Sequence, residues 1–182
     1  KRGVAVHINA FNFPIWGMLE KIAVNLMAGV AAVVKPSEYT SYLTELMVKE
    51  IIDSKILPEG SLQLIPGTGK GILDHVGHND IVTFTGSATT GKILKSHPNI
   101  LENSVPFNME ADSLNACVLG ENIDKNSEEF RIFIKEIYRE MTVKTGQKCT
   151  AVRRILVPEN IIDQVQKALI TKLEKTVIGN PE

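Results

Sequence analysis

The first hundred residues alternate short β-branched runs with stretches whose apolar residues recur at helical spacing. Strands are expected at residues 4–8, 30–34, 62–65 and 81–84, and helices at 18–27, 43–51, 72–76 and 87–97. The run Val30 to Val34 is apolar throughout, as expected for a parallel strand that is covered on both faces. Alternation of this kind is typical of βαβ units with right-handed crossovers. The sequence therefore predicts an α/β fold with a doubly wound parallel sheet.

The second part of the chain has a different rhythm. Extended stretches at 104–110 and 116–119 precede a long amphipathic helix at 130–141, a strand at 150–157 and a closing helix at 162–173. A polar Glu-Ala-Asp-Ser segment at 110–113 separates the two patterns. We therefore expect two domains, residues 1–111 and residues 112–182.

Composition narrows the function classes. The 20 Lys and Arg residues against 21 Asp and Glu residues give a net charge of −1, which argues against a nucleic-acid-binding protein. No apolar run approaches the roughly 20 residues of a membrane span, and no secretion leader is visible. Two cysteines make neither a disulfide framework nor a zinc site, which favours a reducing, cytoplasmic compartment. The four histidines lack metal-ligand spacing and an obvious acidic partner, so no metal is expected.

Two glycine-rich turns follow predicted strands, where doubly wound sheets bind phosphates. The turn at 67–72, which contains Gly69, misses the dinucleotide fingerprint by one position, and an ordinary strand-to-helix turn is the simpler interpretation. The turn at 86–93 resembles a P-loop, but Ile93 stands where a hydroxyl must bind magnesium. This turn fits either the phosphates of a dinucleotide or a plain helix cap.

One cysteine is a candidate nucleophile. Cys149 lies in a glycine-containing loop between the long helix and a predicted strand, and Lys148 beside it would favour a thiolate. Inert packing is the alternative, and it is the interpretation for Cys117 in its apolar strand. Taken alone, Glu110 is a solvated carboxylate and Asn12 is a turn residue.

Five short motifs together match one family in order and spacing. They are Asn12-Phe13-Pro14, Lys35-Pro36-Ser37-Glu38, Phe84-Thr85-Gly86-Ser87 with Gly91, Glu110, and Gly146-Gln147-Lys148-Cys149. The sequence resembles the aldehyde dehydrogenase superfamily over essentially its whole length, down to residues 177–181. The resemblance implies a Rossmann-like cofactor domain followed by the first part of an α/β catalytic domain.

The resemblance also implies a role for each matched residue. Cys149 would attack the aldehyde, Asn12 and the backbone N–H of Cys149 would hold the oxyanion, and Glu110 would activate water. Residues that would bind the cofactor are Lys35, Pro36, Ser37, Glu38, Gly69, Phe84, Thr85, Gly86 and Ser87. The resemblance favours NADP, whereas Glu38 would bind a ribose hydroxyl and repel the additional phosphate of NADP. The cofactor is therefore expected to be NAD(P), with the choice left open.

The residues after Glu110 depart from the Leu-Gly-Gly-Lys that is usual in the superfamily. The variant, Ala111-Asp112-Ser113-Leu114-Asn115, resembles the phenylacetate-degradation branch, in which a hydratase domain follows the dehydrogenase and the substrate is a CoA-linked semialdehyde. Because Glu110 is present, hydrolytic release is expected rather than acylation of CoA. The changed residues after Glu110 affect the expected orientation of its carboxylate and the access of water to it.

The superfamily comparison also implies that this segment is incomplete. The segment by itself would not turn over an aldehyde. The protein would form homo-oligomers through regions outside this segment. A catalytically silent structural module and, less favoured, a phosphate-binding nucleotide hydrolase are the alternatives.

Overall fold

The computed structural model describes residues 2–180 and divides them into two compact units, which meet in sequence between Asp112 and Ser113. This division lies one residue from the predicted boundary. Pro181, the last residue of the C-terminal motif, lies outside the described residues. Within the described part of the chain, no helix has the length and apolar character needed to cross a membrane.

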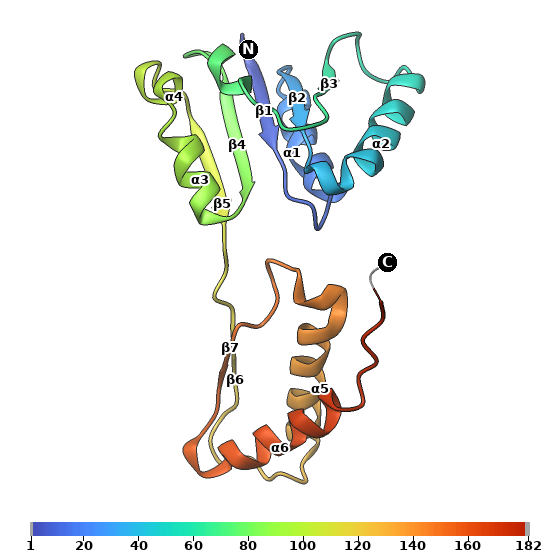
Figure 1. Ribbon diagram of the computed structural model, residues 1–182, viewed down its shortest axis with the longest axis vertical. Helices are drawn as coiled ribbons and strands as arrows, with labels where there is room; N and C mark the ends of the chain where they lie inside the picture. Colours follow the sequence, from blue (N-terminus) through green and yellow to red (C-terminus); the bar gives the residue numbers. More distant parts are fainter. Residues whose placement is uncertain (1, 181–182) are drawn as a thin grey trace. The chain divides into compact units, whose positions relative to one another are not determined.

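The first unit is built on a five-stranded sheet whose neighbouring strands are all parallel (Figure 1). The strands are β1 (Val4–Ile8), β2 (Ala31–Lys35), β3 (Leu62–Leu64), β4 (Ile81–Gly86) and β5 (Phe107–Ala111), in the order β3-β2-β1-β4-β5. The order reverses at β1, which pairs with β2 on one side and β4 on the other. The predicted doubly wound parallel sheet is confirmed.

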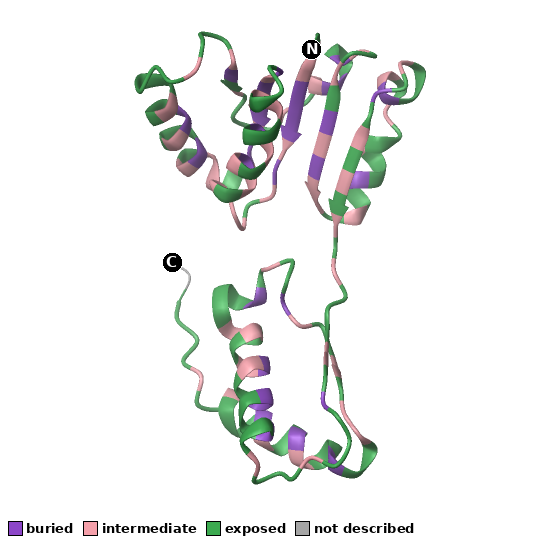
Figure 2. Ribbon diagram, turned by 180° about the vertical axis from the view of Figure 1, so that it is seen from behind, coloured by how far each residue is buried: buried purple, intermediate pink, exposed green. Residues whose placement is uncertain are grey.

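Helices cover both faces of this sheet. Helices α1 (Trp16–Met27) and α2 (Ser41–Asp53) pack on the face that carries Ala32 and Val34. The opposite face, with Val6 and Val82, is covered by η2 (Ile72–His75), α3 (Ala88–Lys95) and α4 (Pro98–Glu102). Buried residues therefore lie along β1, β2 and β4, between the two helical layers (Figure 2).

The second unit contains a two-stranded parallel sheet with its own core. Its elements are β6 (Ala116–Val118), α5 (Glu128–Thr142), η3 (Val143–Gly146), β7 (Arg154–Leu156), η4 (Glu159–Ile161) and α6 (Ile162–Leu173). Ser127 begins α5 by accepting a hydrogen bond from the Phe130 N–H at 3.2 Å. Ile137 on α5 is fully buried against Val165 and Leu169 of α6. The cleanest helical periodicity in the sequence thus builds this core.

Three sequence predictions need correction. Pro98 does not merely end a helix: it opens α4, because proline fits a first helical position and His97 caps the helix by accepting from the Asn99 N–H at 3.3 Å. The strand expected at 150–157 is only β7, because the residues before Arg154 form a turn. His97 has an acidic partner, Asp74, at 3.2 Å between Nε2 and Oδ1.

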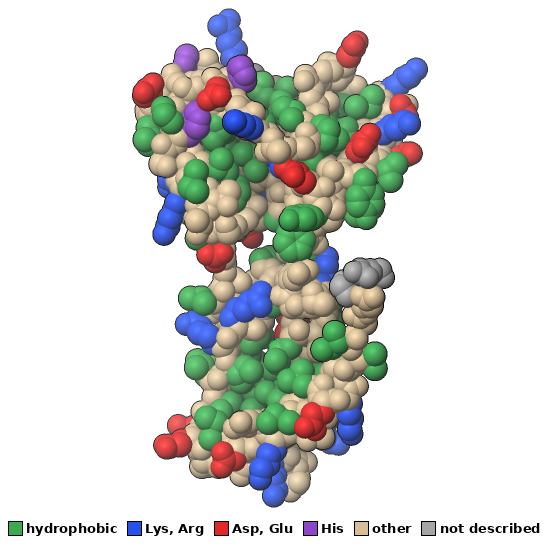
Figure 3. Space-filling view, in the orientation of Figure 1, with side chains coloured by type: hydrophobic (Ala, Val, Ile, Leu, Met, Phe, Trp, Pro, Cys, Tyr) green, Lys and Arg blue, Asp and Glu red, His purple; other side chains and the backbone are tan. Residues whose placement is uncertain are grey.

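The surfaces of both units mix charge types. Figure 3 shows acidic and basic side chains interspersed on the visible face of each unit, together with hydrophobic side chains. In the second unit, Leu114, Val118 and Leu156 are more than half exposed. Neither unit shows a continuous basic surface on this visible face.

Candidate functional site

The predicted cofactor residues gather where the parallel strands of the first unit end. Lys35 is the last residue of β2, and its carbonyl accepts a hydrogen bond from the Asn9 N–H, just after β1, at 2.9 Å. On β4, Thr85 pairs in register with Glu110 of β5. The carboxyl edge at the point where strand order reverses is the binding position of doubly wound sheets.

Lys35 and Gly69 are neighbours in space. A Cβ at Gly69, whose φ is +64°, would lie 2.9 Å from Cγ of Lys35. Burial lowers the pKa of the Lys35 amine, and the charge of Glu38 opposes that shift. Pro36 is buried, Ser37 is half-buried, and Glu38 is exposed where η1 (Glu38–Thr40) begins. The edge of β2 thus presents an amine and a carboxylate beside a glycine.

The glycine turn after β4 is closely packed. Phe84 is buried, and a Cβ at Gly86 would meet its ring at 2.5 Å. Ser87 caps α3, since its hydroxyl oxygen accepts from the Thr90 N–H at 3.2 Å. Gly91 faces Met109 of β5, where a Cβ would overlap the sulfur atom. The turn is therefore packed on Phe84 and Met109 and capped by Ser87, and its contact with the pyrophosphate stays a prediction.

Lys21 is a site residue that sequence analysis missed. Its ammonium, on α1, donates to Asn9 Oδ1 and to Thr85 Oγ1, both at 2.7 Å, so it links the ends of β1 and β4. Burial lowers the pKa of Lys21, and the charges of Glu20 and Glu110 oppose that shift. The available signal was its position between the buried Met18 and Ile22, where a charge is unusual.

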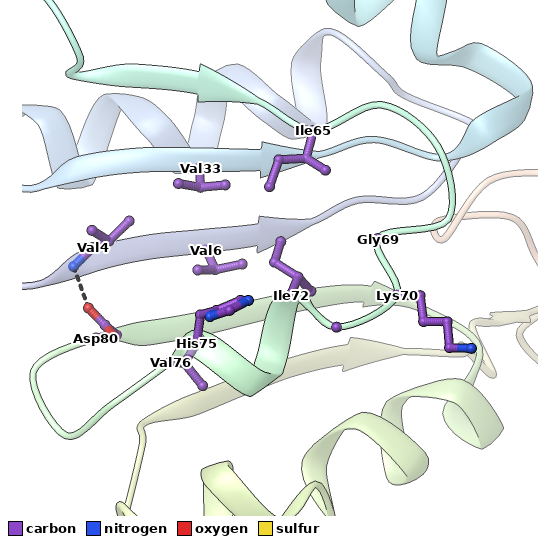
Figure 4. Close-up of a pocket in the computed structure, with 11 residues that line it drawn as sticks. Val4, Val6, Val33, Ile65, Gly69, Lys70, Ile72, His75, Val76 and Asp80 are labelled. Carbon is purple, nitrogen blue, oxygen red and sulfur yellow. Dashed lines mark hydrogen bonds between the residues drawn. The ribbon is translucent and has the colours of Figure 1, made fainter.

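An apolar hollow of about 390 Å³ lies on the sheet face beneath η2 (Figure 4). Val6, Val33 and Ile72 form its walls, and Gly69 stands at the end nearest the carboxyl edge. At the opposite end, Asp80 accepts a hydrogen bond from the Val4 N–H at 2.7 Å. The hollow is suited to a flat apolar group that approaches from the edge.

The candidate nucleophile lies in the second unit. Cys149 is exposed, in the loop that follows η3, whereas Cys117 is half-buried on β6 and burial raises its pKa. The ammonium of Lys148 forms an ion pair with Glu140 at 2.8 Å, so its charge is partly neutralised and stabilises a Cys149 thiolate less. Among residues 2–180, the backbone N–H of Cys149 has no protein acceptor. The loop therefore presents a thiol and an available donor from the same residue.

The sequence pattern of the aldehyde dehydrogenase family matches residues 2–182, essentially the whole chain. The chain belongs to the aldehyde dehydrogenase family. The resemblance identified from the five motifs is confirmed.

Two similar proteins are themselves named as dehydrogenases of aldehydes. The chain is 48% identical over 179 residues to 3,4-dehydroadipyl-CoA semialdehyde dehydrogenase of Aromatoleum evansii, covering 98% of this chain and 35% of that protein. It is 32% identical to human aldehyde dehydrogenase 1A1, over 98% of this chain and 35% of the relative. The chain thus spans about a third of the length of these relatives.

A solved aldehyde dehydrogenase has the same fold. The betaine aldehyde dehydrogenase of Staphylococcus aureus, crystallised with NAD⁺, superimposes with a TM-score of 0.85 at 32% identity. The comparison covers 98% of this chain and 34% of that one.

The catalytic residues that the aldehyde dehydrogenase motifs imply are divided between the two units. Glu110 is exposed on β5, and Asn12 is half-buried in the bend before α1, both in the first unit. Cys149 belongs to the second unit. Their catalytic roles stay predictions.

Proposed function

We propose that this chain supplies the cofactor crevice and the nucleophile of an enzyme that oxidises an aldehyde to a carboxylic acid with NAD(P). The observation that carries the proposal is the exposed Cys149, whose backbone N–H has no acceptor within residues 2–180, in an aldehyde dehydrogenase chain. A thiol and an adjacent fixed donor are what covalent attack on a carbonyl requires.

The proposed chemistry begins with the thiolate of Cys149 attacking the aldehyde carbon. The new C–S bond makes a thiohemiacetal, whose oxyanion would be held by the Cys149 N–H and the side-chain amide of Asn12. The hydride that leaves the thiohemiacetal carbon would be accepted by a bound cofactor, and a thioester on Cys149 would remain. Glu110 would then take a proton from water, whose oxygen attacks the thioester, releasing the acid and the thiolate.

The residues present fit NAD(P). When bound, the nicotinamide accepts the hydride. Gly69 packs so closely against the Lys35 side chain that a Cβ would clash there, and the buried Nδ2 of Asn9 has no hydrogen-bond partner among the described residues. Lys35 and Glu38 would contact the ribose, and the turn at Gly86 and Ser87 would lie against the pyrophosphate. The remaining predicted contacts are Pro36, Ser37, Gly69, Phe84 and Thr85.

The substrate class we propose is a CoA-linked semialdehyde. The 48% identical relative is named for such a substrate, and the departure after Glu110 resembles the same branch. Homo-oligomerisation through regions outside the chain and a cytoplasmic location stay predictions, the latter resting on two free cysteines.

The test is the absorbance of reduced nicotinamide produced by the full-length enzyme that contains this chain. NAD and NADP are assayed separately with simple aldehydes and a CoA-linked semialdehyde. Cys149→Ala should abolish turnover, and Cys117→Ala, on β6 and outside the nucleophile loop, is the matched control. Equal rates for Cys149→Ala and the unaltered enzyme would refute the role of Cys149. Absence of turnover with every substrate would favour the catalytically silent module.

No observation favours the nucleotide hydrolase. Position 93 on α3 is an exposed isoleucine, which cannot bind magnesium. Magnesium-dependent hydrolysis of ATP by the same preparation would revive that alternative.

A further inference from the structure

The loop that carries Cys149 is held by side chains from both of its flanks. Lys144, Thr145 and Gly146 have left-handed φ values of 52°, 54° and 71°, so the chain turns sharply before the cysteine. The ion pair between Lys148 and Glu140 ties the loop to α5. Loop carbonyls then receive hydrogen bonds from two further side chains, and these two residues carry the inference.

Arg153 binds the peptide that precedes Cys149. Its Nη2 donates to the carbonyl of Lys148 at 3.3 Å and to that of Gly146 at 2.9 Å. The Lys148 carbonyl and the Cys149 N–H belong to one planar trans peptide, so they point in opposite directions. By holding the carbonyl, Arg153 aims the Cys149 N–H away from itself.

Asn115 binds the peptide that follows Cys149. Its Nδ2 donates to the Cys149 carbonyl and, at 3.1 Å, to the carbonyl of the buried Ala151. The Asn115 carbonyl in turn accepts from the N–H groups of Arg153 and Arg154, at 2.8 and 3.0 Å. Asn115 is therefore itself fixed by the residues that begin β7.

Fixing both peptide planes beside a residue fixes its φ and ψ. The direction of the bond from Cα to Cβ follows from these two angles, and the sulfur atom then has only one rotatable bond left. We propose that Asn115 and Arg153 are positioning residues that set the direction of the Cys149 thiol and of its backbone N–H. The inference rests on the proposed function, in which Cys149 is the nucleophile.

Asn115 directly follows the four residues, Ala111 to Leu114, that depart from the superfamily pattern. The side-chain amide reaches the nucleophile loop from just before β6. Replacing it with alanine removes two donors, and replacing it with aspartate sets carboxylate oxygens against two carbonyl oxygens. Both changes release the peptide after Cys149.

The experiment compares Asn115→Ala, Asn115→Asp and Arg153→Ala in the full-length enzyme. The matched control is Asn126→Asp, because Asn126 is exposed before α5 and makes the same charge change outside the loop. Hydrogen–deuterium exchange of the peptide that spans residues 146–151 measures anchoring without any need for activity. Steady-state kinetics then separate kcat from the KM for the cofactor.

We expect the three loop variants to exchange the 146–151 peptide at least tenfold faster, with the rest of the protein and the Asn126→Asp control unchanged. Because misplacement by about 1 Å can cost two orders of magnitude in rate, kcat should fall roughly 100-fold while the cofactor KM stays constant. A variant that merely folded poorly would have fewer active sites, in proportion to its unfolded fraction, as counted by titration with substrate. The kcat of each folded site would be unchanged.

Two results would overturn the inference: unchanged exchange in the loop, or wild-type kcat in Asn115→Ala. If Asn115→Ala does not fold, Asn115→Asp and Arg153→Ala decide the question by the same measures. If the unaltered enzyme oxidises no aldehyde but the variants still exchange the loop faster, the proposed function is contradicted. The anchoring of the loop by Asn115 and Arg153 then still holds.

Discussion

Substitution of Gly91 by alanine tests why the turn after β4 carries its second glycine. Gly91 is the buried position of α3, and a Cβ there would overlap the Met109 sulfur, lie 3.0 Å from Met109 Cγ and 3.1 Å from Phe84 Cε1. If these contacts explain the glycine, the cost of Gly91→Ala depends on Met109. If the glycine serves a phosphate, the two positions are independent in the unliganded protein.

The magnitudes follow from opposing effects. Alanine gains about 1 kcal/mol over glycine in a helix interior, and overpacking costs about 1–3 kcal/mol, so Gly91→Ala should lose about 1 kcal/mol. Met109 is only half-buried, so Met109→Ala should cost less than the 2–5 kcal/mol typical of fully buried truncations. The double variant should lose about 1–2 kcal/mol less than the sum, because removing Met109 relieves most of the overpacking and leaves only the contact with Phe84.

Urea unfolding followed by tryptophan fluorescence is the assay, since Trp16 is the single tryptophan of this chain and begins α1 in the first unit. Its ring meets Phe13 edge-on at 5.6 Å, so its environment changes when that unit unfolds. Free energies that add to within 0.5 kcal/mol would refute the steric explanation of Gly91.

Three further predictions concern the carboxyl edge and the sheet. Burial lowers the pKa of His7 in the folded state below its usual value of 6.5, so the contribution of His7 to the free energy of unfolding should be complete above pH 6.5. This contribution should fall as the pH drops below 6.5 and become constant below the folded pKa. His7→Gln should remove this dependence in urea titrations at several pH values. Lys21→Met removes the donor to the Thr85 hydroxyl and to the side-chain amide of Asn9, so it should lower the free energy of unfolding by about 2 kcal/mol. A stability equal to that of the unaltered chain would show that this bridge is dispensable. Gly69→Ala forces an L-residue to φ +64° against Lys35; it should cost about 1 kcal/mol and weaken cofactor binding measured by calorimetry, whereas an unchanged affinity would separate Gly69 from the cofactor site.

Long periodic elements were predictable because burial imposes their pattern. Helix α5 buries Phe130, Phe133 and Ile137 at helical spacing, and β2 is apolar because helices and η2 cover the sheet on both faces. Helix α4 has too few residues for a periodic pattern, and its Pro98 both ends the preceding helical pattern and fits the first turn of a new helix. Short elements have too few residues for periodicity to outweigh capping and turn chemistry.

The site was predictable only where a motif is contiguous in sequence. Cys149 and its loop are one motif, and the family comparison supports that resemblance. Lys21 could not be found this way, because its partners Asn9 and Thr85 lie 12 and 64 residues away in sequence. The sequence of the turn fits either a dinucleotide phosphate or a helix cap, but it does not reveal that Gly86 packs against Phe84 and Gly91 against Met109.

The departure after Glu110 gains its meaning from what its side chains bind. A glycine pair has no side-chain donors or acceptors, so glycines at 112 and 113 would leave these two positions with backbone hydrogen bonds alone. Here the carboxylate of Asp112 accepts from the Ala88 N–H at 3.4 Å, at the start of α3. Asn115 reaches the nucleophile loop, and the Leu114 carbonyl accepts from Arg154.

Asp112 bonds to α3 within the first unit, and Asn115 bonds to the Cys149 loop within the second. A return to glycines at 112 and 113 would remove the Asp112 bond and keep Asn115. The exchange of the 146–151 peptide would then stay slow, whereas Asn115→Ala would speed it, so the two ties of the segment can be measured one at a time.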